Sequence, residues 1–148
     1  MGKTPTREYP YEIDTLLGDT LYIGKNKITI SDDYVSNSNI KKVIMPDSVK
    51  VIENNAFEGC SNLETIYFSK NLESIGPYAF LNTSLKKIYL PDTITSIGSG
   101  AFSHDTFETS NLEKIVLPSL LNTINSNLFW GSKIKSITLP DNVISINS

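Results

Sequence analysis

Cysteine and histidine are almost absent from this 148-residue sequence, and their scarcity limits the chemistry that the chain can perform. The single cysteine, Cys60, excludes a disulfide framework and a cysteine-rich metal site within the chain. The single histidine, His104, lacks the further ligands that a metal site needs, and a Ser-His-Asp arrangement would have to be built around it. No glycine pattern of the phosphate-cradling kind is present. We therefore expect no enzyme, no cofactor and no metal site.

Long apolar runs and a strong charge imbalance are also missing. No run approaches the roughly 20 apolar residues that a membrane-spanning helix needs. The N-terminal segment MGKTPTREYPYEIDTLLG lacks the apolar core of a signal peptide, so either the protein is intracellular or a signal was removed. The net charge of -3 gives no overall field that would favour nucleic acid or a membrane surface.

The sequence does contain a repeat, which is clearest in SLKKIYLPDTITSIGSGAF at residues 84–102. The apolar residues of this segment recur in the same order before and after it. A fixed period between about 20 and 50 residues is typical of a solenoid, in which stacked units bury a continuous core. The units begin, at spacings of 23, 22, 27 and 22 residues, at Ile40, Leu63, Leu85, Leu112 and Ile134.

Each unit opens with an apolar-x-apolar step rich in β-branched residues, which predicts a strand. A proline usually ends the strand, because proline lacks the amide that a parallel ladder needs. A second inward apolar pair and an Ala-Phe or Leu-Phe turn follow. We expect strands in one curved parallel sheet at residues 21–23, 43–45, 66–68, 88–90, 115–117 and 137–139. Stacked units would also align one ladder of Phe57, Phe80, Phe102 and Phe129.

The two ends of the array differ from its middle. Residues 1–20 are expected to be an N-terminal tail and cap, and residues 21–148 an array of five to six units, the first degenerate and the last incomplete. The array stops before a final phenylalanine turn, so its last strand should have an uncovered edge, which we expect a longer parent chain or self-association to cover. The residues available to cover the first core layer are Tyr9, Tyr11, Ile13, Leu16 and Leu17.

The units resemble the BspA-like leucine-rich repeats of bacterial and protozoan surface proteins. The segments that carry the resemblance include IKKVIMPDSVKVIENNAFEGC, LETIYFSKNLESIGPYAF and LKKIYLPDTITSIGSGAF, and the resemblance extends over residues 21–148. It implies a mainly β, right-handed leucine-rich-repeat superhelix with a parallel concave sheet and short helical or irregular turns. It also implies binding, through adhesion to host or matrix proteins or capture of an intracellular partner, and it offers no catalytic residues. The shortness of the array and the lack of a visible signal peptide depart from that pattern.

Three features lie outside the repeat pattern. The longest spacing contains five extra residues, His104 to Glu108, which we expect to form a solvated loop that leaves the core in register. Cys60 follows a glycine in a turn and is interpreted as a small buried filler rather than a nucleophile. Trp130 follows the ladder residue Phe129 and is either an exposed anchor or part of the C-terminal packing.

The outward side chains of the expected strands predict where a partner would bind, because residues alternate between core and surface along a strand. One outward column combines tyrosines and aliphatic residues, namely Tyr22, Ile44, Tyr67, Tyr89, Val116 and Thr138. The neighbouring column is rich in lysine and contains Lys42, Thr65, Lys87, Lys114 and Ser136. The alternative is that tyrosine and valine simply favour sheet surfaces.

An exposed apolar stripe with aromatic anchors favours a protein-binding surface, and the lysine column favours a partner with an acidic surface. We therefore interpret the chain as a non-enzymatic protein-binding module. In one hypothesis it is an adhesion domain on a cell surface or in a secreted protein. In the other it is a small intracellular inhibitor or adaptor, for example one derived from a phage.

Overall fold

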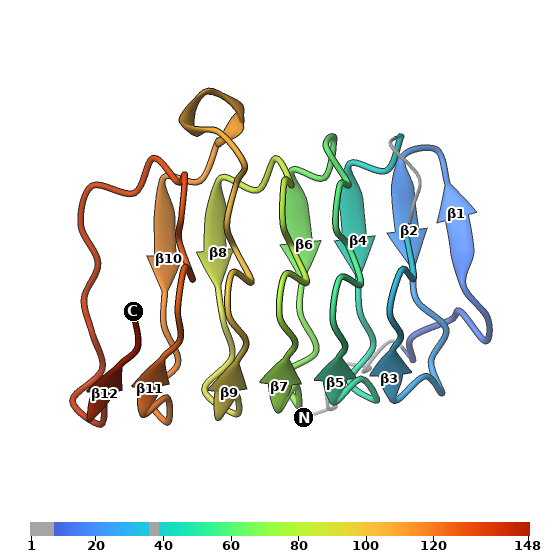
Figure 1. Ribbon diagram of the computed structural model, residues 1–148. Coiled ribbons are helices and arrows are strands. Elements are labelled where there is room, and N and C mark those ends of the chain that lie inside the picture. The colour runs from blue at the N-terminus through green and yellow to red at the C-terminus, as the bar shows by residue number, and fades with distance from the viewer. Residues whose placement is uncertain (1–7, 36–38) are drawn as a thin grey trace, which may run out of the picture.

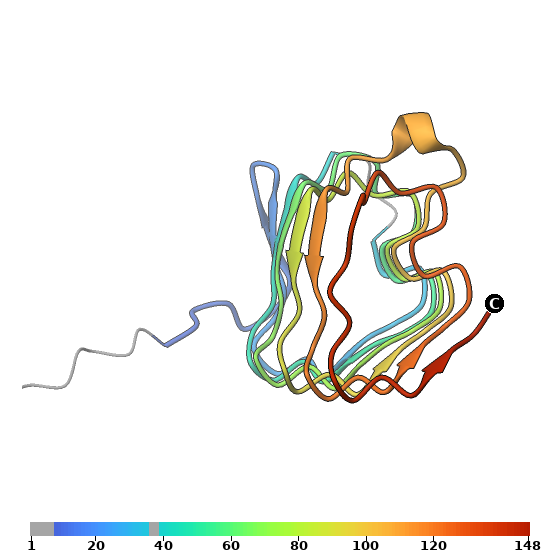
Figure 2. The same cartoon turned by 90° about the vertical axis from the view of Figure 1, so that its left-hand side faces the viewer.

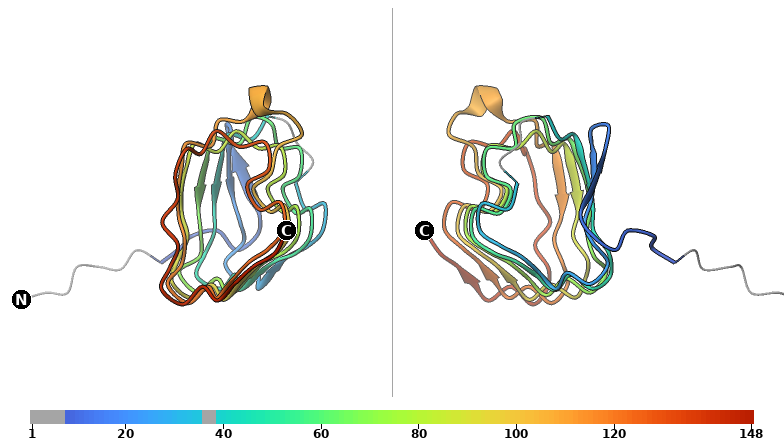
Figure 3. Two further views of the ribbon diagram at one scale, coloured as in Figure 1. Left: turned by 60° about the vertical axis from the view of Figure 1, so that its left-hand side comes forward. Right: turned by 90° about the vertical axis from the view of Figure 1, so that its right-hand side faces the viewer.

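The computed structural model describes residues 8–35 and 39–148, so the first seven residues of the expected tail lie outside the described part. The chain winds into a mainly β solenoid of about six turns with almost no helix, which confirms the expected fold class (Figure 2). Seen nearly along the solenoid axis, successive turns follow almost the same path (Figure 3). Each position of the repeat therefore becomes a column of side chains that runs along the molecule.

One side of the solenoid consists of three-residue strands that lie side by side (Figure 1). The pairing is parallel and in register, with Leu21 opposite Val43 and Ile88 opposite Ile115. We call the outer surface of these strands the strand face. Its strands are β2 (Thr20–Tyr22), β4 (Lys42–Ile44), β6 (Thr65–Tyr67), β8 (Lys87–Tyr89) and β10 (Lys114–Val116).

A second row of very short strands closes the opposite edge of each turn, and the sequence pattern did not predict it. These strands pair in the orders β3-β5-β7-β9 and β11-β12, again in parallel. Two residues are too few to show the period-2 alternation by which a strand is recognised, so only the inward apolar pair was visible in the sequence. The strands are β3 (Thr29–Ile30), β5 (Val51–Ile52), β7 (Ser74–Ile75), β9 (Ser96–Ile97), β11 (Thr123–Ile124) and β12 (Ser145–Ile146).

The phenylalanine ladder is confirmed. Neighbouring rings are stacked, with centroids 5.2 Å apart at the first step, 5.4 Å at the second and 6.5 Å at the third. Burial of each ring stabilises the fold by roughly 1.5–3 kcal/mol before the entropy of ordering is counted. Each ladder turn is preceded by a residue with a positive φ, a conformation that glycine and asparagine tolerate best. Those residues are Asn55, Tyr78, Gly100 and Asn127.

The expected single sheet is interrupted between β6 and β8, which are not paired, although β7 and β9 pair across the same step of the array. Phe68 directly follows β6, at a position where other units have isoleucine, methionine or leucine. Its ring is only partly buried and packs edge-on against Phe80, with centroids 5.8 Å apart. We attribute the separation of β6 and β8 to this larger side chain.

The strand expected at residues 137–139 does not form, which corrects the sequence-based prediction. No backbone pairing joins this segment to β10. The last layer is open, with the inward residue Ile146 66% exposed. The layer is held by the pairing of β12 with β11 and by side-chain hydrogen bonds such as the one that the Asn142 amide donates to the Ser119 carbonyl. That a longer chain or a second copy covers it stays a prediction.

The N-terminal end is closed differently from the way the sequence suggested. Ile13, Leu16 and Leu17, which were expected to cover the first core layer, are all at least half exposed. The strand β1 (Thr15–Leu17) pairs antiparallel with β2 and continues the first row instead of lying over the core. Polar contacts of Asp14 close this end.

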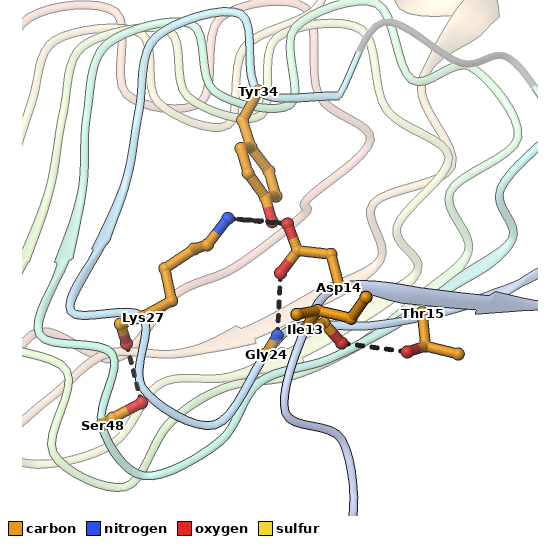
Figure 4. A network of polar contacts seen from close by, with 7 residues as sticks. All are labelled: Ile13, Asp14, Thr15, Gly24, Lys27, Tyr34 and Ser48. Atoms are coloured by element: carbon orange, nitrogen blue, oxygen red, sulfur yellow. Dashed lines mark hydrogen bonds and ion pairs between the residues drawn. The ribbon is translucent and has the colours of Figure 1, made fainter.

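Asp14 is the centre of that polar closure (Figure 4). Its carboxylate accepts the backbone N–H of Gly24 at 2.8 Å, pairs with the Lys27 ammonium at 2.6 Å and accepts the Tyr34 hydroxyl. The Lys27 Nζ also lies 4.3 Å from the centroid of the Tyr34 ring. Partial burial opposes the charge of Asp14, but these hydrogen bonds outweigh it and hold its pKa below the usual value.

The insertion leaves the core in register, as expected, but His104 does not belong to a solvated loop. Asp105, Thr106 and Glu108 are exposed, and a short 3₁₀ helix, Phe107–Thr109, projects from the array (Figure 1). His104 itself is only 2% exposed. Its backbone N–H donates to the carbonyl of Trp130 at 2.7 Å, so this residue continues the regular stacking of the turns before the chain loops out.

Candidate protein-binding surface

The strand face places tyrosines in solvent at its centre. Tyr67 is 56% and Tyr89 61% exposed, and Val116 continues their column at 43%. The residues that precede Tyr89 and Val116 in the same strands, Ile88 and Ile115, are buried. The expected alternation of core and surface residues is therefore confirmed in β8 and β10.

The N-terminal part of the same column is covered by the chain itself. The ring of Tyr11 stacks on that of Tyr22 with centroids 4.1 Å apart, and the Tyr9 hydroxyl donates to the carbonyl of Ile44 at 3.1 Å. Burial is the main cause that raises the pKa of Tyr9 to about 12, with neighbouring tyrosines adding to it. Tyr22 and Ile44 face outward as expected but are only partly exposed, so the open stripe begins at Tyr67.

The other end of the column is also less regular than expected. Thr138 is exposed, but it lies on the segment that forms no strand. A cavity of about 930 Å³ separates this segment from β10. The candidate surface that is both exposed and held by strands therefore consists of Tyr67, Tyr89 and Val116.

Lysines border this stripe, as the sequence predicted. Lys87 and Lys114 are exposed, whereas Lys42 and Thr65 are partly buried and Ser136 is exposed beside the last, unpaired segment. The Nζ of Lys114 lies 5.7 Å from the centroid of the Tyr89 ring, a distance at which a cation–π attraction operates. Within the described residues, the lysines that form ion pairs are Lys25, Lys27, Lys50 and Lys70. All four lie outside the lysine column of the strand face.

The separation of β6 from β8 creates a groove in the strand face. It encloses about 850 Å³ and contains Tyr67 and Tyr89 among its lining residues, together with Ile66 and Phe68. The charged lining includes three lysines and two glutamates: Lys70, Lys86, Lys87, Glu64 and Glu113. Sequence reasoning missed this groove, and the available signal was the phenylalanine at position 68 in a column of smaller residues.

Cys60, the remaining candidate nucleophile of the sequence, is buried. Burial raises the pKa of the Cys60 thiol to about 11, and its Sγ lies 3.0 Å from the carbonyl of Val35. Cys60 is 1% exposed, so its interpretation as a small buried filler is confirmed. Within residues 8–35 and 39–148, no group of three or more His, Cys, Asp or Glu side chains is placed to hold a metal ion. The same residues contain no helix that could span a membrane.

The family is established by sequence. The model of the BspA type leucine-rich repeat region matches residues 19–108, in six copies. The chain therefore belongs to the BspA-type leucine-rich-repeat family, a non-enzymatic kind of repeat protein. Among curated proteins there is no significant match.

Solved structures share the fold. A leucine-rich-repeat protein from Bacteroides ovatus is 34% identical with a TM-score of 0.77, over 86% of this chain and 33% of that one. The pneumococcal vaccine antigen PcpA is 25% identical with a TM-score of 0.65, over 91% and 35%. A leucine-rich cell surface protein from Faecalibacterium prausnitzii, 22% identical with a TM-score of 0.57 over 91% and 42%, supports the fold alone. The chain thus spans about a third of the length of the first two proteins.

Proposed function

We propose that this chain is a non-enzymatic protein-binding module whose partner docks on the strand face at Tyr67 and Tyr89. The observation that carries the proposal is the exposure of two tyrosines on adjacent units, both of which line one groove. Tyrosine is favoured at binding hot spots because its ring buries a large area while few torsions are ordered. The strands beneath hold both rings at fixed positions.

The charges around the groove suggest what the partner surface offers. Lys87 and Lys114 lie in the column next to the tyrosines and are free to meet carboxylates of a partner. Such rim charges mainly raise the rate of encounter and orient the partner, whereas the buried rings supply most of the affinity. We therefore propose a partner that presents acidic side chains around an apolar or aromatic centre.

The cellular setting is a further part of the proposal. The repeats resemble those of bacterial and protozoan surface proteins, and one similar solved structure is that of a pneumococcal vaccine antigen. We propose that this chain acts in adhesion at a cell surface or outside the cell. The alternative is an intracellular inhibitor or adaptor, which would use the same face. Locating the protein in its native cell by fractionation distinguishes the two: recovery in the surface or secreted fraction supports adhesion, and recovery in the cytosol contradicts it.

The binding site can be tested before a natural partner is known. A phage-displayed library of random 16-residue peptides is selected on the wild-type protein, because such libraries enrich ligands of surfaces suited to binding. We expect the enriched peptides to combine aromatic or aliphatic residues with Asp or Glu. We also expect the enriched pool to lose binding to the double variant Tyr67→Ala with Tyr89→Ala.

The control is Ile28→Ala, which removes an exposed apolar residue that lines neither the groove nor any strand of the strand face. The pool should bind this variant like the wild type. A pool that binds the double variant as well as it binds the wild type would place the preferred binding surface elsewhere, and the proposal would be wrong.

A further inference from the structure

A small notch lies on the turn side of the solenoid, next to the insertion and away from the strand face. It has a volume of about 320 Å³. Trp130, the only tryptophan of the chain, is 66% exposed there, and Tyr78 is 42% exposed. Asn127, Asp105, His104 and Ser103 complete its polar lining. Nothing in the repeat itself requires the two aromatic residues.

The notch arises because one unit carries small residues between two units that carry large ones. Backbone hydrogen bonds stack Tyr78 on Ser99 and Gly100 on Ser126, so Tyr78, Gly100 and Asn127 occupy equivalent turn positions. The ring of Tyr78 lies over Gly100, where a β-carbon would come within 2.4 Å of it. Trp130 and Tyr78 therefore belong to units on either side of the unit that contains Gly100.

Tyr78 adopts a strained backbone conformation. Its φ is 55, whereas the equivalent positions hold asparagine or glycine, which accept this conformation at lower cost. Strained residues that persist in a fold are frequent at binding sites, where the side chain is needed. The tyrosine is thus a locally unfavourable choice that places a ring at the notch.

His104 adds an unsatisfied acceptor. Its Nε2 lies 2.8 Å from the carbonyl oxygen of Thr83, which can only accept, so Nε2 carries the hydrogen. The Nδ1 is then an acceptor, and it is buried without a donor among the residues that the structure describes. An unpaired buried polar atom costs free energy unless a further group satisfies it. This nitrogen has no exposed surface, so the exposed groups of the notch are the ones that a ligand would contact.

The electrostatics of the notch favour a cation. Asp105 is an exposed carboxylate, held by the Asn82 amide, which donates to its Oδ2 at 2.7 Å. The lining includes no lysine or arginine. Two exposed aromatic rings present negatively polarised faces, which attract ammonium groups. A primary ammonium combines the positive charge that the rings attract with N–H groups that can donate to the Asp105 carboxylate.

We propose that this notch binds a primary ammonium group of the lysine side-chain type, through the rings of Trp130 and Tyr78 and the carboxylate of Asp105. The site lies away from the strand face, so a test of ammonium binding at the notch does not test the proposed partner-binding surface. It is large enough for one alkylammonium chain, since small-ligand sites begin at about 300 Å³.

The fluorescence of Trp130 reports directly on this site because the chain has no other tryptophan. The protein is titrated with n-butylammonium chloride, a mimic of the lysine side chain, and in parallel with n-butanol at matched ionic strength. We expect a saturable fluorescence change with the ammonium compound at millimolar concentration and no saturable change with the alcohol. Equal responses to both compounds would overturn the proposal, because they would leave no role for the charge.

Two variants test whether Asp105 and Tyr78 contribute to ammonium binding. Asp105→Asn removes the charge and keeps the shape, and Tyr78→Asn installs the residue that Asn55 and Asn127 provide at equivalent positions. Each should weaken n-butylammonium binding about tenfold, the scale of a single cation–π or charge contact of roughly 1.4 kcal/mol. The control is Tyr67→Ala with Tyr89→Ala, which should bind the compound like the wild type. Unchanged affinity in Asp105→Asn and Tyr78→Asn would refute the site.

Discussion

The strand face and the phenylalanine side of the solenoid are built from the same repeat but differ in regularity. On the phenylalanine side, the first three rings stack at 5.2 and 5.4 Å and are almost fully buried. On the strand face, the sheet is interrupted between β6 and β8, and the aromatic side chains at that step are exposed. The comparison indicates that the columns that stabilise the fold are separate from the exposed column on which we propose that a partner binds.

The two faces differ in regularity because their columns tolerate amino-acid substitutions to different degrees. A ladder position is in contact with the same position of both neighbouring units, so a change in one ring affects three layers. An outward position of the strand face contacts mainly solvent and its immediate neighbours, so its residue type can vary among tyrosine, isoleucine, valine and threonine. A repeat protein can therefore change its binding surface without changing its core.

The largest expected effect is a loss of stability when a ring of the phenylalanine ladder is removed. Phe80→Ala should lower the free energy of unfolding by about 3–5 kcal/mol, because it leaves a cavity between Phe57 and Phe102. Urea denaturation measures the change. Tyr67→Ala, which removes an exposed ring of the other face, should change the same quantity by less than about 0.5 kcal/mol. Similar losses in both variants would abolish the distinction between the two faces.

A second prediction divides the insertion into a structural and a dispensable part. His104→Ala should cost about 2 kcal/mol, since a buried ring and its hydrogen bond to Thr83 are lost. Replacing Asp105 to Glu108 by a Gly-Ser linker of equal length should leave the melting temperature nearly unchanged, because the described side chains of that segment are exposed. Thermal melts of the two variants decide this, and a linker variant as unstable as His104→Ala would mean that the projecting loop is structural.

The smallest expected effect concerns the N-terminal closure and its dependence on pH. The folded pKa of Asp14 lies below its ordinary value of 3.8, so its contribution to stability is present above that value and is lost as the pH falls through the folded pKa. Asp14→Asn should therefore flatten the dependence of the melting temperature on pH below about pH 5. The difference should stay under about 1 kcal/mol, because the group is partly exposed. Parallel pH curves for the two proteins would show that Asp14 does not close this end.

The repeated features were predictable from the sequence, because each was seen several times. The ladder of Phe57, Phe80, Phe102 and Phe129 and the alternation in β8 and β10 follow from residues that recur at a fixed spacing. One substitution within the repeat had a consequence that the pattern could not show. Phe68 fits the apolar pattern, yet it stands where two strands are unpaired and it lines the groove between them.

The features that the sequence did not predict depend on residues that occur once. Nothing in the spacing of Tyr9 and Tyr11 indicates that they cover Tyr22 and Ile44 instead of the core layer. The burial of His104 depends on the backbone of Trp130, a contact between units that a linear pattern does not contain. Of the candidate site, the outward direction of Tyr67 and Tyr89 could be predicted, whereas the groove that joins them could not.

The most direct test of the account measures binding and stability in the same samples. One peptide enriched on the wild-type protein is titrated by calorimetry into the wild type and into Tyr67→Ala with Tyr89→Ala, and urea denaturation of both proteins is recorded. We predict a loss of more than about 2 kcal/mol in binding, or roughly 30-fold in Kd, with the free energy of unfolding changed by less than about 1 kcal/mol. Unchanged affinity, or a loss of affinity accompanied by a comparable loss of stability, would contradict the separation of binding from stability.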